Sequence, residues 1–278
     1  DFKNYRYQLG SVQEVGNIYP KYYLKAFYDG MTAEGDTMPI SLIRSAWAGS
    51  AKYGALVWSG DIVSTFECFR RQVQAGLNMA VAGIPWWTTD IGGFHGARTD
   101  DPDFHRLYIR WFEYGCFCPV MRLHGNRNPQ EGYGAEQIGS GSDNEIWSFG
   151  DKAYEISKKY IFLRERLRDY IRAQMKKAHE DGTPVMRPVF YDFPADQESW
   201  NVEDAYLFGP DLYVAPVMED HVTEREVYLP DGTAWFNAWT GEKYEGGQNV
   251  TVAAPLDTIP VFVKEGADAE KLLNIFSE

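Results

Sequence analysis

Asp61 has the surroundings of a group that transfers protons. It ends the stretch Trp58-Ser59-Gly60-Asp61, which follows a short apolar run. An indole ring beside a carboxyl group excludes water from it and raises its pKa, which favours a proton donor near neutral pH. An aspartate at this point could equally be the N-cap of a following helix. The pattern is therefore compatible with either a catalytic role or a helix-capping role for Asp61.

Asp90 lies in a similar setting, after Trp86-Trp87-Thr88-Thr89 and before Gly92-Gly93-Phe94. The two glycines would let backbone or a ligand approach closely. The two tryptophans, Trp87 among them, could form the walls of a sugar pocket, because aromatic rings present flat apolar faces to ligands. The alternative is an aspartate that stabilises a turn.

Three basic residues accompany these carboxylates. Arg122 and His124 alternate, so in an extended segment both side chains lie on one side of the chain. Such a pair could bind hydroxyl groups or stabilise a developing charge; it could also be a structural ion pair with a hydrogen-bonded histidine. Arg44 ends another apolar run and, taken alone, favours a structural salt bridge.

Short apolar runs and amphipathic helices alternate through the first two thirds of the chain. The pattern predicts strands at residues 38–43, 54–58, 79–87 and 117–121, and helices near 18–30, 64–77, 101–115 and 146–179. Ser64-Thr65-Phe66-Glu67 fits a capping box, and residues 125–143 fit a loop. Polar residues at the ends of parallel strands are typical of a (β/α) barrel, of which these four strands would form half. A doubly wound sheet is the alternative.

The pattern changes after Pro184. Short apolar runs near 185–191, 212–217, 226–229 and 259–263 are separated by proline and glycine turns, which predicts an antiparallel β-sandwich. The expected fold class is therefore α/β, with the C-terminal half of a (β/α)8 TIM barrel at residues 1–190 and a β-sandwich domain at 191–278.

Composition excludes several classes of function. With 27 Lys and Arg against 40 Asp and Glu, the net charge of −13 disfavours a nucleic-acid partner. No apolar stretch is long enough to span a membrane. The five histidines and three cysteines lack the spacing of metal ligands, and no P-loop, dinucleotide-binding or zinc-protease motif occurs, so neither a metal nor another cofactor is predicted. Because the chain opens at Asp1 and not at a methionine, with a polar, loop-like start, we expect a piece of a longer protein. An export signal would have been lost with the missing part, and the compartment we predict is the cytoplasm.

Six ordered motifs resemble the α-glucosidase and α-xylosidase family, glycoside hydrolase family 31. They cover nearly the whole chain and are Ile43-Arg44-Ser45-Ala46-Trp47-Ala48-Gly49, Trp58-Ser59-Gly60-Asp61, Trp87-Thr88-Thr89-Asp90-Ile91-Gly92-Gly93-Phe94, Pro119-Val120-Met121-Arg122-Leu123-His124, Pro184-Val185-Met186-Arg187-Pro188 and Leu207-Phe208-Gly209-Pro210-Asp211-Leu212.

The resemblance implies a retaining exo-α-glycosidase that acts on α-glucosides or other α-linked oligosaccharides. It implies that Asp61 is the general acid/base and that Arg44 lies near the catalytic carboxylates and biases their protonation. The resemblance also implies that a further set of residues lines the sugar subsite, namely Trp58, Asp90, Phe94, Arg122 and His124, with Trp87 beside them.

One part of the family pattern does not occur in this sequence. The nucleophilic aspartate of the family lies on the fourth barrel strand, and no carboxylate here has that sequence context. We therefore expect an enzyme that needs an upstream half, and a chain that is inactive alone. The alternatives are a carbohydrate-binding relic without activity, and an α-xylosidase or other α-glycosidase of the same family.

Overall fold

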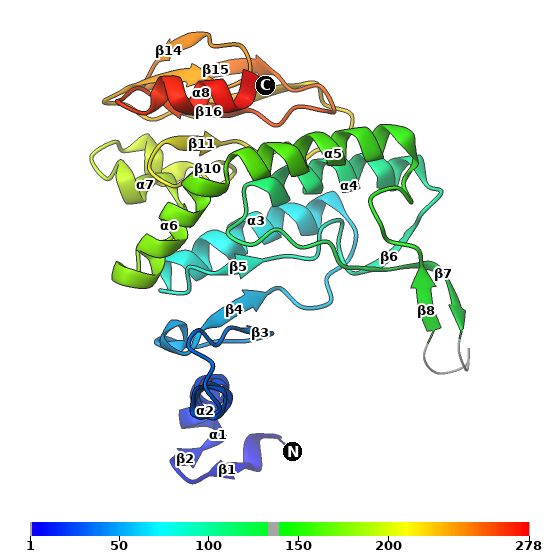
Figure 1. The fold of residues 1–278 in the computed structure, drawn as a ribbon, viewed down its shortest axis with the longest axis vertical. Helices are drawn as coiled ribbons and strands as arrows, with labels where there is room; N and C mark the ends of the chain where they lie inside the picture. Colours follow the sequence, from blue (N-terminus) through cyan, green and yellow to red (C-terminus); the bar gives the residue numbers. More distant parts are fainter. Residues whose placement is uncertain (1, 133–138, 278) are drawn as a thin grey trace.

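The computed structural model describes residues 2–132 and 139–277, in two packed parts (Figure 1). The first part holds a parallel sheet covered by helices, and the second is an antiparallel β domain at the C-terminal end of the chain. A small N-terminal group of elements lies at the opposite end of the molecule. That group consists of η1 (Phe2–Asn4), β1 (Arg6–Tyr7), β2 (Gly10–Ser11), α1 (Val12–Val15) and η2 (Gly16–Ile18).

Three short parallel strands position the residues that could do chemistry. They are β3 (Ser41–Ile43), β4 (Ala55–Trp58) and β5 (Trp87–Thr88), in that order in the sheet. The predicted fourth strand at 117–121 is not a strand, although its end runs alongside β5: the Val120 amide donates to the Trp87 carbonyl (3.2 Å) and the Ile91 amide donates to the Arg122 carbonyl (3.3 Å). The predicted strand at 79–87 is shortened, because Met79–Val81 complete a helix.

The helices that cover this sheet follow the apolar periodicity of the sequence. They are α2 (Tyr19–Ala33), α3 (Phe66–Val81) and α4 (Pro102–Cys116), with the short η3 (Ser50–Tyr53) before β4. The N-cap of α3 is Thr65, whose hydroxyl accepts from the Cys68 amide at 3.1 Å. The predicted capping box from Ser64 is therefore wrong by one residue, and Glu67 pairs with Arg71 instead.

Two predicted segments have a different structure. The long helix expected at 146–179 is two helices, α5 (Gly150–Arg166) and α6 (Arg168–Asp181), which meet at the fully buried Leu167. The region expected to be a loop forms strands β7 (Asn126–Gly132) and β8 (Gly139–Ser142); β7 pairs with β6 (His95–Arg98), and β8 pairs with β7. Hydrogen bonds between backbone groups define this hairpin. Its glycine-rich sequence lacks the alternation of apolar residues from which strands are predicted.

The β domain consists of two layers. A six-stranded antiparallel sheet has the order β14-β13-β16-β11-β10-β9, and β12 pairs with β15 in the second layer. The bounds are β9 (Met186–Arg187), β10 (Tyr206–Phe208), β11 (Leu212–Val214), β12 (Glu224–Leu229), β13 (Ala234–Asn237), β14 (Lys243–Glu245), β15 (Gln248–Ala253) and β16 (Val261–Lys264), with α7 (Val189–Asp192), η4 (Glu198–Asn201) and α8 (Ala269–Ser277) around them.

Alternation along the central strands gives the six-stranded sheet two buried faces. Tyr213 and Phe262 pack against the two-stranded layer, in one core with Val227 and Val252. Their neighbours, such as Leu212, face the other way into the core formed with the barrel helices. The expected antiparallel sandwich at the C-terminal end is thus confirmed, and the exact division at residue 190 stays a prediction.

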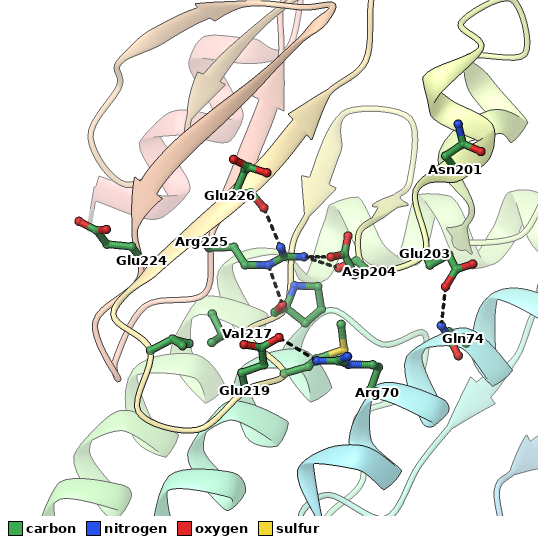
Figure 2. Close-up of a pocket in the computed structure, with 13 residues that line it drawn as sticks. Arg70, Gln74, Asn201, Glu203, Asp204, Val217, Glu219, Glu224, Arg225 and Glu226 are labelled. Atoms are coloured by element: carbon green, nitrogen blue, oxygen red, sulfur yellow. Dashed lines mark hydrogen bonds and ion pairs between the residues drawn. The ribbon is translucent and has the colours of Figure 1, made fainter.

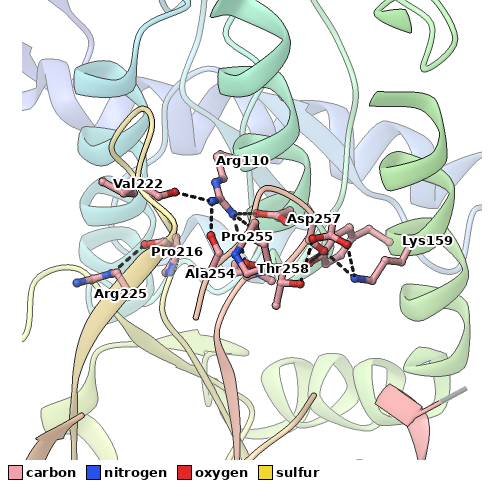
Figure 3. Close-up of polar contacts among 12 residues, drawn as sticks. Arg110, Lys159, Pro216, Val222, Arg225, Ala254, Pro255, Asp257 and Thr258 are labelled. Atoms are coloured by element: carbon pink, nitrogen blue, oxygen red, sulfur yellow. Dashed lines mark hydrogen bonds and ion pairs between the residues drawn. The ribbon is translucent and has the colours of Figure 1, made fainter. Parts of the chain in front are cut away.

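Arg110 of α4 holds the β domain against the barrel helices (Figure 3). Its guanidinium is buried and donates to the backbone carbonyls of Ala254 (2.7 Å), Pro255 (3.0 Å), Val222 (3.2 Å) and Thr258 (3.3 Å). A planar guanidinium can satisfy several fixed oxygen atoms at once, which an ammonium cannot do with the same geometry. Arg110 is therefore a structural residue of the domain interface.

Glu113 lies beside this interface and should make stability depend on pH. Its carboxyl group is fully buried, accepts from Arg110 at 3.2 Å, and has a pKa raised to about 8 by burial. The folded chain therefore keeps a proton that the unfolded chain loses near pH 4.5, so stability falls as pH rises from about 4.5 to about 8.

We expect Glu113→Gln to flatten this pH dependence, because the amide cannot ionise. Urea unfolding at pH 5 and at pH 8.5 measures it: the free energy of unfolding of the variant should fall less than that of the parent chain. Glu219→Gln, which changes an exposed carboxylate paired with Arg70, is the control and should keep the parent slope. An unchanged slope in Glu113→Gln would show that Glu113 is ionised across this range.

Candidate active site

Five polar residues lie at one end of the parallel sheet, three of them after its strands and two in the segment beside β5. Arg44 comes directly after β3, Asp61 three residues after β4, and Asp90 two residues after β5. Arg122 and His124 end the segment that runs alongside β5. Because the strands are parallel, these ends lie at one edge, and we call this group the strand-end site.

Arg44 and Asp61 form an ion pair across neighbouring strands. Nη2 of Arg44 lies 2.5 Å from Oδ1 of Asp61, and both side chains are about half exposed. The Arg44 hydrogen bond holds the pKa of Asp61 below its ordinary value. The expectation that the Trp58 ring raises this pKa is therefore wrong for this structure, because a close cation outweighs desolvation of an exposed carboxyl group. Asp61 also caps no helix, since Thr65 caps α3.

We expect Arg44→Met to raise the pKa of Asp61 towards its ordinary value, since the substitution removes the cation and the donated hydrogen bond. A carbon-13 NMR titration of the Asp61 carboxyl group measures this. Arg70→Met is the control, because Arg70 forms a similarly exposed pair with Glu219 at 3.0 Å, and should leave the Asp61 titration unchanged. An equal titration midpoint in the parent and Arg44→Met would contradict the ion pair.

Asp90 is the buried carboxylate of the strand-end site. Its side chain has no exposed surface, and Oδ1 accepts a hydrogen bond from Nη2 of Arg122. Burial raises the pKa of Asp90, while Arg122 and His124 oppose that rise. Within the described residues Oδ2 has no hydrogen-bond partner. A buried acceptor without a partner is costly, so this oxygen would accept a hydrogen bond from a donor such as a sugar hydroxyl once the groups that cover it move aside.

Aromatic side chains line the same group. The Trp58 ring lies 5.5 Å from the Arg44 guanidinium and 5.9 Å from that of Arg122, which is cation–π distance. The rings of Phe94 and His124 are 5.3 Å apart at an angle of 34°. His124 favours the charged forms of both Asp61 and Asp90 and so contributes to lowering the pKa of each. Flat apolar rings beside polar oxygens suit a pyranose, which has both kinds of surface.

Trp87 does not belong to this surface. Its side chain is only 4% exposed and packs in the core against α3, where a Cβ atom on Gly76 would lie 2.7 Å from the indole nitrogen. Successive strand residues point to opposite faces, so Trp58 and Trp87 lie on different sides of the sheet. Trp86 lines a cavity at the start of β3 and β4, together with Pro39. The prediction that Trp86 and Trp87 form the walls of a sugar pocket beside Asp90 is therefore wrong.

Sequence reasoning missed two residues near the site. His95 follows Phe94 and influences the pKa of Asp61. Arg127 is fully buried behind Asp90 and donates to the carbonyls of Ile91 and Gly92. His95 could have been found from its position after the Gly-Gly-Phe motif, whereas nothing in the glycine-rich segment around Arg127 signals a buried cation.

Other features of the described residues offer less for catalysis. A cavity of about 470 Å³ lies between α3 and the β domain (Figure 2). Both of its arginines are paired within it, Arg225 with Asp204 at 2.6 Å and Arg70 with Glu219. In residues 2–132 and 139–277, no cluster of three metal-binding side chains occurs, and no helix there is long and apolar enough to cross a membrane.

Comparison with known protein families assigns both parts of the chain. Residues 2–174 match the model of the glycosyl hydrolases family 31 TIM-barrel domain, and residues 182–267 match that of the glycosyl hydrolase family 31 C-terminal domain. The chain belongs to glycoside hydrolase family 31. The resemblance inferred from the strand-end motifs is thereby confirmed, as is the TIM-barrel fold class.

Several family 31 relatives are similar over almost the whole chain. An α-xylosidase of Saccharolobus solfataricus is 37% identical over 94% of this chain and 34% of its own length. Alpha-glucosidase 2 of Bacillus thermoamyloliquefaciens is 34% identical over 92% of this chain and 30% of its own. A solved family 31 α-xylosidase from a soil metagenome, complexed with xylose, has 55% identity and a TM-score of 0.94, over 98% of this chain and 41% of its own. The chain thus spans about a third of the curated relatives.

Proposed function

We propose that this chain supplies the C-terminal half of the catalytic barrel of a retaining exo-α-glycosidase. The observation that carries the proposal is the strand-end site, in which a half-exposed Asp61 lies beside Arg44 and a buried Asp90 has an oxygen free for a hydroxyl group. Family membership supports the retaining mechanism. The nucleophile would come from an upstream half-barrel, and we call these 278 residues joined to such a half the completed barrel.

In the first step of the proposed reaction, the upstream carboxylate attacks the anomeric carbon while the glycosidic bond breaks. Asp61 gives its proton to the leaving oxygen. In the second step the Asp61 carboxylate takes a proton from water, and the water oxygen bonds to the anomeric carbon as the glycosyl-ester bond breaks, which releases the sugar and restores the upstream carboxylate. Asp61 must therefore be protonated first and charged afterwards.

The charges around Asp61 support this change of role. A nearby anionic nucleophile would raise the pKa of Asp61, and formation of the glycosyl ester would remove that negative charge. Arg44 then favours the charged form of Asp61, as in the present structure. The anionic nucleophile thus favours Asp61 as an acid before the ester forms, and Arg44 favours Asp61 as a base after it forms.

The sugar would be held by groups on both sides of Asp61. The free oxygen of Asp90 and the exposed ring of His124 would bind hydroxyl groups. Trp58 and Phe94 would contact the apolar face of the ring.

An α-glucoside is the substrate predicted from the sequence, and an α-xyloside is the second candidate. The 55% identity to an α-xylosidase complexed with xylose favours the second. Glucose carries a hydroxymethyl group that xylose lacks. A pocket with room for this group accepts an α-glucoside, and a pocket without that room accepts only an α-xyloside. Rates of the completed barrel with nitrophenyl α-glucoside and nitrophenyl α-xyloside test the proposal; hydrolysis of neither would contradict it.

A sugar-binding protein without activity is the other function that this site could support. Calorimetric titration with glucose and xylose, together with an assay of turnover, separates the two functions. Saturable heat with turnover in the completed barrel supports the glycosidase. Saturable heat without turnover in that same protein would favour the binding role.

A further inference from the structure

Arg127 is a buried cation that lies among uncharged oxygen atoms. Its side chain has no exposed surface. Nε donates to Oδ1 of Asn144 at 2.8 Å, and Nη1 donates to the Ser64 hydroxyl at 3.1 Å. The remaining donors contact backbone carbonyls, that of Ile91 at 3.3 Å and that of Gly92 at 3.5 Å. Each nitrogen of the guanidinium therefore has an oxygen acceptor.

Burial of this charge is costly, and the charge of the nearby Asp90 offsets that cost only in part. In the part of the chain that the structure describes, no carboxylate lies within ion-pair distance of Arg127. Burial lowers its pKa to about 10, and the Phe104 ring lies 4.6 Å from the guanidinium. A charged group held in this way needs fixed acceptors, since loss of any one leaves a buried donor unsatisfied.

The acceptors of Arg127 belong to three separate loops at the end of the sheet. Ser64 lies in the loop after β4, which also carries Asp61. Ile91 follows Asp90 directly in the loop after β5. Asn144 precedes α5. Arg127 thus connects the loop of the proposed acid/base with the loop of the buried carboxylate.

The space around the guanidinium admits no larger neighbours. A Cβ atom on Gly125 would lie 2.5 Å from Nη2 of Arg127, and a Cβ atom on Gly92 would lie 3.0 Å from the same atom. The backbone at Gly92 also has a φ of +83°, which disfavours other residues. Glycine at both positions lets the loops close around a planar fork of donors, which a lysine cannot reproduce.

From this geometry we infer that Arg127 is a positioning residue, which fixes the Asp61 loop and the Asp90 loop relative to each other. The inference rests on the proposed function, in which both aspartates act on one sugar. Arg127 touches neither the sugar nor the reacting atoms. Its effect on the reaction is transmitted through the carbonyls of residues 91 and 92 and the hydroxyl of Ser64.

Arg127→Lys in the completed barrel tests this role. The change keeps the charge and removes the fork, and we expect kcat/KM to fall by about 10- to 100-fold, because small displacements of catalytic groups are costly. We expect both a higher KM and a lower kcat, because the Asp90 loop contributes to binding of the sugar and the Asp61 loop carries the group that transfers the proton. Arg110→Lys is the matched control, because Arg110 is also buried and also donates to backbone carbonyls, but at the β domain (Figure 3).

The comparison of these two variants decides the question. An Arg110→Lys protein with kcat/KM close to the parent and a large loss in Arg127→Lys support the positioning role. Equal losses in both would overturn it, because a general loss of stability would then explain them. Asn144→Ala, which removes only the Nε acceptor, gives a second variant if Arg127→Lys does not fold, and should lower kcat/KM in the same direction.

Amide hydrogen exchange separates this inference from the proposed function. In the 278-residue chain, the Gly93 amide donates to the Asp90 carbonyl at 2.9 Å and the Ser64 amide donates to the His95 carbonyl at 3.1 Å. Arg127→Lys or Asn144→Ala should speed exchange at both amides by about tenfold or more, and Arg110→Lys should not. Unchanged exchange contradicts the positioning role; an inactive completed barrel with parent residues contradicts the proposed function instead.

Discussion

Asp61→Ala in the completed barrel should lower kcat for an α-glycoside with a poor leaving group by about 10²–10⁴-fold. The reason is that the leaving oxygen of such a substrate needs a proton as the glycosidic bond breaks. The measurement is the initial rate with a disaccharide, compared with that of a nitrophenyl glycoside of the same sugar. The nitrophenolate departs with little help, so its bond-breaking step should lose less.

Asp204→Ala provides the matched control for this variant. Asp204 is also a half-exposed aspartate paired with an arginine, Arg225 at 2.6 Å, but it lies at the cavity between α3 and the β domain (Figure 2). Its loss should leave both rates near those of the parent. If Asp61→Ala keeps its disaccharide rate within about tenfold of the parent, Asp61 is not the general acid.

Asp90→Asn should weaken the binding of glucose and xylose by about two orders of magnitude. The buried carboxylate has one oxygen paired with Arg122 and one available to a sugar hydroxyl. Hydrogen bonds to a charged group contribute about 1.5–3 kcal/mol each, and the amide also leaves Arg122 without its anionic partner. Isothermal titration of the completed barrel measures the two affinities.

The Asp90 variant needs a check that the protein still folds. Asparagine keeps the volume of aspartate, so a thermal transition of parent cooperativity would show an intact fold. Asp100→Asn, at an exposed aspartate paired with Arg98 at 2.8 Å, should leave sugar affinity unchanged. An affinity of Asp90→Asn within about threefold of the parent would remove Asp90 from the sugar subsite.

The sequence predicted the elements whose apolar pattern is strong. Helix α4, with Asp101 as its N-cap and Pro102 in its first turn, begins where the sequence indicates. Strand β4 and, in the β domain, strands β11, β12 and β16 also follow their apolar runs, whereas the run predicted at 185–191 forms only the two-residue β9 and then the helix α7. The break between α5 and α6 was not predictable, because apolar periodicity continues through the buried Leu167 while the direction of the helix changes. The hairpin β7–β8 depends on backbone pairing that periodicity does not report.

The grouping of the strand-end site was predictable from topology. Polar residues that follow parallel strands must lie at one edge, and Arg44, Asp61 and Asp90 do so. The protonation of Asp61 was not predictable, because it depends on an arginine 17 positions away in sequence, at 2.5 Å in space. The position of Trp87 was mispredicted because side chains alternate across a strand, and its neighbour Trp58 occupies the sugar-facing side.

A crystal structure of the completed barrel with a bound monosaccharide, either glucose or xylose, tests the central claim most directly. We predict one pyranose over the Trp58 ring, with a hydroxyl group donating to Oδ2 of Asp90 and the Asp61 carboxyl group within hydrogen-bond distance of the anomeric oxygen. A sugar bound elsewhere, or an Asp61 carboxyl group directed away from the anomeric oxygen, would contradict the account.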